Sequence, residues 1–150
     1  MSPSNAAGWT EVLGEHAANP QTPRTSGETI LALGKEWKFS SLEARIKAQF
    51  EQWVRSGARI AIKEAELEGD MEEADKLRRA YQADLGAGHY KWDGRNVRSA
   101  RGDIPGLKHL IFLLLRRCHP EITEETVDQI FKEAPRDCGV ALAWASGKST

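Results

Sequence analysis

Hydrophobic residues recur along this chain at three- and four-residue steps, which predicts a mainly α-helical fold. The first stripe predicts an amphipathic helix of about 25 residues, with Ser40 or Ser41 as its N-cap. Its members are Leu42, Ile46, Phe50, Trp53, Gly57, Ile60 and Leu67. A second stripe over residues 71–85 has Asp70 as its expected N-cap. Two such helices with a short break predict an antiparallel helical hairpin.

The C-terminal half predicts further helices. Residues 105–117 are apolar nearly all round, which is typical of a helix at the buried centre of a fold. Asp103 is the expected N-cap of this helix, and Thr123 is the expected N-cap of the next one. A last short helix follows Pro135, and residues 95–101 allow one more.

Residues 29–39 differ from the rest because short runs of strand-forming residues flank a glycine. The expected strands are Ile30–Leu33 and Glu36–Phe39, with Gly34-Lys35 as the turn between them. One hairpin alone is only marginally stable, so it must pack on the helices. The predicted fold is therefore mainly α, a bundle of about four to five helices with a small N-terminal β-hairpin.

The chain divides into two parts by composition. Residues 1–28 are rich in Pro, Ser, Thr, Asn and Gly, which predicts a flexible N-terminal segment. Residues 29–150 are then a single helical domain. The N-terminus lacks the basic and apolar regions of a signal peptide, and the run Leu110–Leu115 is too short to span a bilayer. We therefore expect no membrane association, a cytoplasmic location and reduced thiols.

The net charge of −1 hides an uneven distribution. Residues 89–119 hold seven basic and two acidic residues, a net charge of +5, whereas residues 120–150 hold three basic and six acidic residues, a net charge of −3. Two interpretations remain open. The segments can neutralise each other in the fold, or the basic one can present a face to an acidic partner.

The residue types that carry most enzyme chemistry are not arranged for it. The four histidines have no helical metal-site spacing, and the two cysteines form no Cys-x-x-Cys motif. Cys118 is expected to be a small buried hydrophobe, and the C-terminal end of a helix disfavours a thiolate. The sequence thus predicts no catalytic residues, no metal, no cofactor and no enzyme.

One stretch is a functional candidate. Arg95, Arg98 and Arg101 recur every three residues, so a helix would place them on one face, and Tyr90 and Trp92 precede them. Arginines with stacking aromatics are typical of nucleic-acid binding. The alternative places Trp92 in the core and pairs the arginines with the acidic C-terminal part.

Several features follow one another over roughly residues 28–145. They are a Gly-Lys hairpin with aromatic strands, an amphipathic helix, the pattern Tyr90-x-Trp92-x-Gly94, an apolar helix and the run His119-Pro120-Glu121-Ile122-Thr123. This succession resembles the tail-assembly chaperones of long-tailed bacteriophages. The resemblance implies a non-enzymatic role, because such chaperones coat the tape-measure protein and recruit tail-tube subunits.

A chaperone that binds helices needs an apolar groove with a charged rim. Candidates for that groove are Trp37, Trp53 and Trp92, although a tryptophan is more often part of the core than of an interface. The expected partner is a protein, either the tape-measure or the tail-tube protein, in the cytoplasm of the phage host, and a homo-oligomer is compatible with the sequence. The alternative is a small nucleic-acid-binding or regulatory protein that uses residues 89–117.

Overall fold

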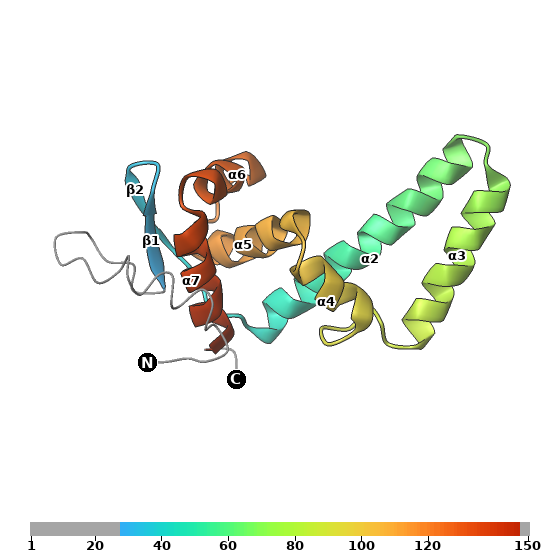
Figure 1. Cartoon of the computed structure of the whole chain (residues 1–150), viewed down its shortest axis with the longest axis horizontal. Coiled ribbons are helices and arrows are strands. Elements are labelled where there is room, and N and C mark those ends of the chain that lie inside the picture. The colour runs from blue at the N-terminus through green and yellow to red at the C-terminus, as the bar shows by residue number, and fades with distance from the viewer. Residues whose placement is uncertain (1–27, 148–150) are drawn as a thin grey trace. The chain divides into compact units, whose positions relative to one another are not determined.

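A computed structural model describes residues 28–147, which form six helices and one two-stranded antiparallel sheet (Figure 1). The elements are β1 (Thr29–Ala32), β2 (Lys35–Lys38), α2 (Ala44–Leu67), α3 (Met71–Gly86), α4 (Arg95–Arg101), α5 (Ile104–Cys118), α6 (Glu124–Glu133) and α7 (Pro135–Gly147). The predicted mainly α fold with a β-hairpin is confirmed. The expected flexible segment, residues 1–28, lies outside the described residues except for Glu28.

The described residues divide into two compact units, and each is considered by itself below. The first unit comprises residues 28–44 and 108–147, with the hairpin, most of α5, and helices α6 and α7. The second unit, Arg45–Leu107, holds α2, α3 and α4. Two compact units can still fold as one domain, so the single domain expected over residues 29–150 stays a prediction.

The hairpin turns one residue earlier than the sequence predicted. Ala32 lies opposite Lys35, so the two-residue turn is Leu33-Gly34 and not Gly34-Lys35. Both turn residues have positive φ, 54° and 71°, as a type I′ turn requires. The indole Nε1 of Trp37 donates to the Ala32 carbonyl at 2.9 Å, which holds this register. Each strand therefore begins and ends one residue before its predicted bounds.

Helix α5 supplies much of the buried side of the first unit. Five of its apolar residues are at most 6% exposed, which confirms the predicted buried centre: Leu110, Ile111, Leu113, Leu114 and Leu115. Asp103 caps the helix, because its Oδ1 accepts the Gly106 N–H at 2.9 Å. Thr123 caps α6 in the same way, and its Oγ1 accepts the Thr126 N–H at 3.1 Å.

The predicted serine cap of α2 is wrong, and the backbone around it explains why. The Ser40 N–H donates to the Leu114 carbonyl at 3.2 Å, and the Leu42 N–H donates to the Ala145 carbonyl at 3.1 Å. These bonds hold the chain outside a helical conformation. The Ser40 hydroxyl donates to the neighbouring Ser41 carbonyl, and α2 begins only at Ala44.

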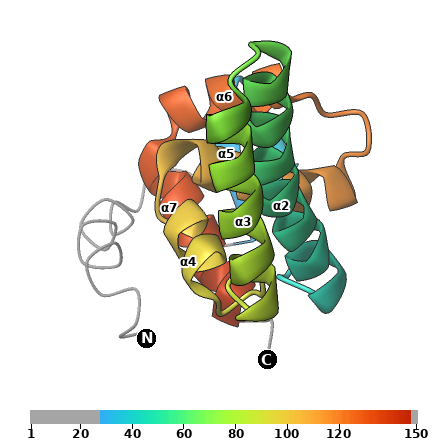
Figure 2. The same ribbon diagram turned by 90° about the vertical axis from the view of Figure 1, so that its right-hand side faces the viewer.

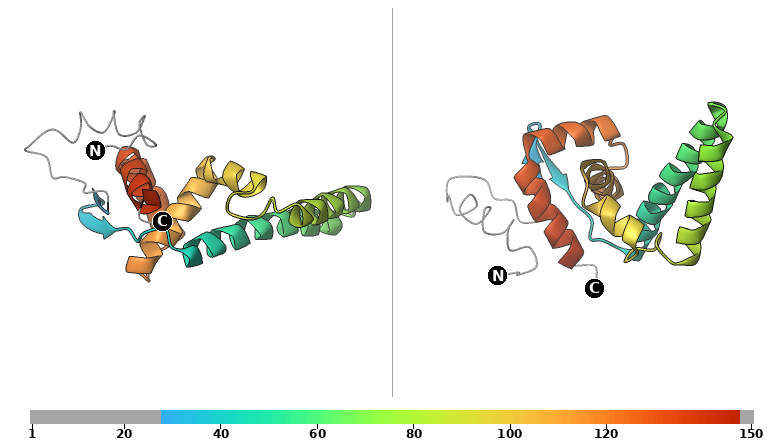
Figure 3. Two further views of the ribbon diagram at one scale, coloured as in Figure 1. Left: turned by 90° about the horizontal axis from the view of Figure 1, so that it is seen from below. Right: turned by 45° about the vertical axis from the view of Figure 1, so that its right-hand side comes forward.

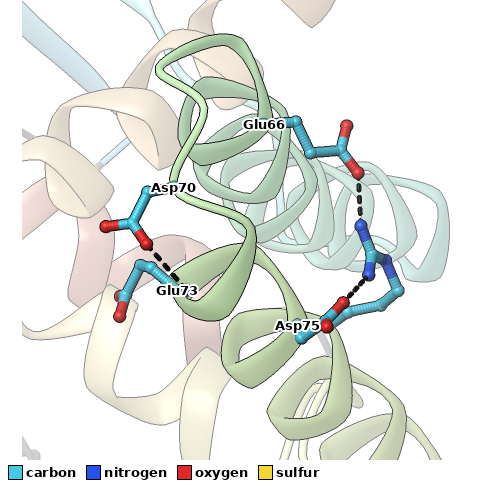
Figure 4. A network of polar contacts seen from close by, with 5 residues as sticks. Glu66, Asp70, Glu73 and Asp75 are labelled. Atoms are coloured by element: carbon cyan, nitrogen blue, oxygen red, sulfur yellow. Dashed lines mark hydrogen bonds and ion pairs between the residues drawn. The ribbon is translucent and has the colours of Figure 1, made fainter.

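In the second unit, α2 and α3 form the predicted helical hairpin. They run in opposite directions from a turn at Gly69, whose φ is +79° (Figure 2, Figure 3). Asp70 is the predicted N-cap of α3, and its Oδ1 accepts the Glu73 N–H at 3.1 Å (Figure 4). Arg78 binds both Asp75 and Glu66, the latter on α2, and so ties the helices together near the turn.

The predicted stripe of α2 is correct only in its N-terminal part. Ile46 and Phe50 are buried, whereas Ile60 is 57% exposed and Leu67 is 78% exposed. The contacts to α3 come from other positions on the helix. Arg59 reaches the Tyr81 hydroxyl, and Glu66 binds Arg78. Ile60 and Leu67 each follow one of these residues, so they lie about 100° round the helix from the positions that contact α3, and they stay exposed.

Candidate partner-binding site

The loop between α3 and α4 is folded tightly on itself. Gly88 has a φ of +79°, and a Cβ on Gly94 would lie 2.4 Å from the Gly88 carbonyl oxygen. The His89 N–H donates to the Asp84 carbonyl at 2.9 Å, and the Asn96 N–H donates to the His89 carbonyl at 3.0 Å. Glycine is therefore required at position 94, which gives a physical reason for the glycine of the Tyr-x-Trp-x-Gly pattern.

Asp84 joins the end of α3 to the start of α4. Its carboxylate accepts hydrogen bonds from the Arg95 guanidinium at 3.2 Å and from the Asn96 amide at 3.0 Å. Tyr90 is buried beside Tyr81, with 5.3 Å between the ring centres. Burial raises the pKa of the Tyr90 hydroxyl above its ordinary value of 10.0. These contacts hold the loop that presents Trp92.

Trp92 belongs to an aromatic cluster with residues of α2. Its ring meets Phe50 edge-on at 5.8 Å, and Phe50 in turn lies 5.5 Å from the Trp53 ring. Phe50 is fully buried, whereas both tryptophans are half-buried. The Lys47 ammonium lies 5.7 Å from the centre of the Trp92 ring. The cluster fixes the indole while leaving part of it accessible.

The guanidinium of Arg101 contacts the same tryptophan. Its guanidinium carbon lies 4.1 Å from the ring centre, and its Nη2 donates to the Trp92 carbonyl at 3.0 Å. Its Nε is buried and has no hydrogen-bond partner among residues 28–147. Burial lowers the pKa of Arg101, an effect that the nearby Asp93 charge opposes. Arg101 therefore holds the end of α4 to the loop.

A shallow depression of about 690 Å³ opens beside this loop. It is lined by Glu51, Ala87, Gly88, His89, Lys91, Trp92, Asp93, Gly94, Arg95 and Arg98. Three of these side chains are cationic and two are acidic, so the wall is basic on balance. Arg98 is exposed and makes no side-chain hydrogen bond or ion pair with any residue from 28 to 147. It is the arginine of α4 most available to a partner, and the exposed Lys91 on the same wall is free as well among the described residues.

The structure brings together only some of the residues singled out from the sequence. Trp92, Arg95 and Arg98 line the depression, while Trp53 and Arg101 support it through the aromatic cluster and the Trp92 ring. The arginines could be identified from the sequence alone, because they recur every three residues along α4. No sequence signal pointed to Asp84 or Glu51, because both come from other helices.

Trp37 lies in the first unit and has a structural role there. It is 7% exposed, and its ring meets the His119 ring edge-on at 5.2 Å. The Lys35 ammonium lies 4.5 Å from its ring centre. With its Nε1 bonded to Ala32 as well, the indole is satisfied within the hairpin.

The expected charge pairing between the basic and acidic segments is realised for some residues only. Lys108 binds Asp128, and His109 Nδ1 lies 3.5 Å from the Glu124 carboxylate. Arg95 instead binds Asp84 of α3, and Arg101 binds the Trp92 carbonyl. Arg95 and Arg101 are therefore held by contacts within the second unit.

The two cysteines differ in their surroundings. Cys118 is exposed, so the prediction that it is buried is wrong, because the buried side of α5 ends at Leu115. Cys138 is fully buried, and burial raises the pKa of its thiol to about 12. Among the described side chains, no three of the types His, Cys, Asp and Glu converge as a metal site.

Comparison of the chain with protein-family models, curated proteins and solved structures gives no match. Over residues 28–147, no helix combines the length and the apolar character needed to cross a membrane. The function must therefore be argued from the depression and the residues around it.

Proposed function

We propose that this chain is a non-enzymatic binding protein whose depression receives an acidic segment of another protein. The observation that carries the proposal is the wall formed by Lys91, Arg95 and Arg98 around the half-buried Trp92. Cations beside an aromatic ring bind carboxylates and apolar side chains together. Because Arg98 has no partner among the described residues, a carboxylate would gain a cation that the fold does not already use.

Two contacts favour a protein segment over a nucleic acid. The guanidinium of Arg101 covers the Trp92 ring at 4.1 Å, so a base would have to displace it in order to stack there. Arg95 is bound to Asp84, so the arginines of α4 do not form one free face for successive phosphates. The small nucleic-acid-binding or regulatory protein remains the second candidate, with less support.

The resemblance to the tail-assembly chaperones of long-tailed phages supplies the candidate partner. In this proposal the chain binds the tape-measure protein in the cytoplasm of the host and helps the tail-tube subunits to assemble on it. The depression then serves as one contact in a larger interaction. An acidic stretch of the tape-measure protein is the segment whose charge fits it.

Co-expression of the full chain with the tape-measure protein of the same phage genome tests the proposal. We expect the tape-measure protein to stay soluble and to co-purify with the chain, and Arg98→Glu to lower the recovered amount. Arg79→Glu is the matched control, because it makes the same charge change at an exposed residue that does not line the depression. A tape-measure protein that stays unbound by the wild-type chain would contradict the proposal.

Fluorescence anisotropy with a labelled random single strand of DNA tests the second candidate. Binding that falls steeply with added salt and is lost in Arg98→Glu would favour a nucleic-acid role. Absence of binding at low salt would remove that candidate and would leave the protein-binding proposal in place.

A further inference from the structure

Helix α2 has an exposed apolar face in its C-terminal half. Ile60 is 57% exposed and Leu67 is 78% exposed, and they lie seven residues apart, which places them on one face of the helix. Arg59 and Glu66 contact α3 and lie about 100° round the helix from this face, whereas the buried Ala65 lies on the far side of α2 from it. The hairpin thus leaves two large apolar side chains of α2 uncovered, and they are aligned along the helix.

Three further residues share this face. Gly57 is exposed in the middle of the helix, and a Cβ there would meet no atom within 4 Å. Glycine weakens a helix interior, and nothing among the described residues requires it at this position. Lys63 and Glu64 lie between Ile60 and Leu67, and both are exposed. The face therefore combines two apolar side chains, a glycine without a side chain, and one charge of each sign.

We propose that this face binds the same face of a second copy of the chain, with the two α2 helices antiparallel. A two-fold axis between Lys63 and Glu64 would place Ile60 of each copy opposite Leu67 of the other. The same axis would place Lys63 opposite Glu64 twice. A two-fold interface requires this kind of self-complementary surface.

The charge along α2 supports the antiparallel direction. Residues 44–63 hold five basic residues and one acidic residue, whereas residues 64–68 hold three acidic residues and no basic one. Parallel helices would bring like charges together, and antiparallel helices bring the basic part of each copy toward the acidic end of the other. On the face itself, Lys63 and Glu64 carry opposite charges, so an antiparallel second copy pairs both of them, whereas a uniformly basic or acidic partner would meet repulsion at one of them.

The pairing surface is separate from the depression. Ile60, Lys63, Glu64 and Leu67 do not line it, so dimerisation and partner binding can succeed or fail independently. Few side chains contribute, which predicts a weak, concentration-dependent dimer and not an obligate one.

Sedimentation equilibrium of the full chain over a wide concentration range tests the dimer. We expect a reversible monomer–dimer equilibrium. Lys63→Glu and Glu64→Lys should each raise the dissociation constant about tenfold, because each places like charges opposite one another. The double variant Lys63→Glu with Glu64→Lys restores opposite charges and should recover the wild-type constant. All three changes are at exposed positions, so circular dichroism should show an unchanged fold.

Replacement of apolar residues by serine provides a second test of the dimer. Leu67→Ser should weaken the dimer, whereas Leu85→Ser, at a 42% exposed position of α3, should not. A chain that remains monomeric at every concentration would overturn the proposal. A dimer that withstands Leu67→Ser, or one that the double charge variant fails to restore, would overturn it as well.

Discussion

The guanidinium of Arg101 stacks on Trp92, with 4.1 Å from its central carbon to the centre of the indole ring. The same guanidinium donates to the Trp92 carbonyl at 3.0 Å. One arginine thus contacts both the ring and the backbone of a residue nine positions earlier. Because of this contact, Arg101 supports the loop, and Arg98 is the arginine of α4 that remains available to a partner.

Replacing Arg101 with alanine should destabilise the protein. The change removes a cation–π contact and a hydrogen bond to a carbonyl, so the free energy of unfolding should fall by about 1–2 kcal/mol. Urea denaturation measures this value. Arg98→Ala is the control and should stay within about 0.5 kcal/mol of the wild type, because its side chain is exposed. Equal losses for the two variants would show that Arg101 has no special structural role.

Gly106→Ala should be among the most damaging single substitutions. A Cβ at this position would lie 1.7 Å from the Ala100 carbonyl oxygen, so the backbone before α5 would have to move. We expect the free energy of unfolding to fall by more than about 2 kcal/mol. Gly86→Ala, where a Cβ would meet nothing within 4 Å, should cause no such loss in the same assay. A Gly106→Ala variant as stable as Gly86→Ala would contradict the described geometry.

The sequence predicted the fold best where local chemistry decides it. Asp70, Asp103 and Thr123 cap their helices as expected, because a cap depends on the next three residues only. The serine cap of α2 failed because carbonyls from α5 and α7 hold the backbone of residues 40–42. Contacts of that kind join distant parts of the chain, so no local pattern reveals them.

The same limit applies to the candidate site. Trp92, Arg95 and Arg98 could be found from their spacing, since one loop and one helix carry them. Their partners Asp84 and Phe50 come from α3 and α2, so the sequence could not say which arginine would be held by the fold. The apolar period of α2 predicted a helix correctly, but it could not show which part of the stripe would stay uncovered.

Acid should weaken the contact between the hairpin and the segment after α5 within the first unit. The Lys38 N–H donates to Nε2 of His119 at 2.9 Å, which requires an unprotonated nitrogen. Burial, and then the charge of Lys35, lower the pKa of His119 below its ordinary value of 6.5. The folded state therefore binds fewer protons than the unfolded state, and the free energy of unfolding falls as the pH drops from 6.5 through the folded pKa.

Urea denaturation from neutral to mildly acidic pH measures this effect. Burial also lowers the pKa of His109, so this residue adds to the wild-type slope with the same sign. His119→Gln removes the titrating group and should make the dependence on pH shallower than in the wild type. An unchanged slope in that variant would show that His119 does not couple protonation to folding.

The two thiols should react very differently with a water-soluble disulfide reagent. Cys118 is exposed, whereas Cys138 is fully buried and its pKa is raised to about 12. In the native protein at mildly alkaline pH we expect one fast-reacting thiol per chain, and a second only after unfolding. Cys118→Ser should abolish the fast reaction. Two fast thiols in the native wild type would contradict the burial of Cys138.

In the proposed function, the depression beside Trp92 binds an acidic protein segment through Arg98. Isothermal titration calorimetry with overlapping peptides of the tape-measure protein tests it most directly. We predict that the tightest peptide is acidic and that Arg98→Glu weakens its binding at least about tenfold, with Arg79→Glu unchanged. Replacing only the acidic residue of that peptide that pairs with Arg98 by lysine should restore binding to the Arg98→Glu chain. Equal affinity of the original peptide for the wild type and for Arg98→Glu would contradict the claim.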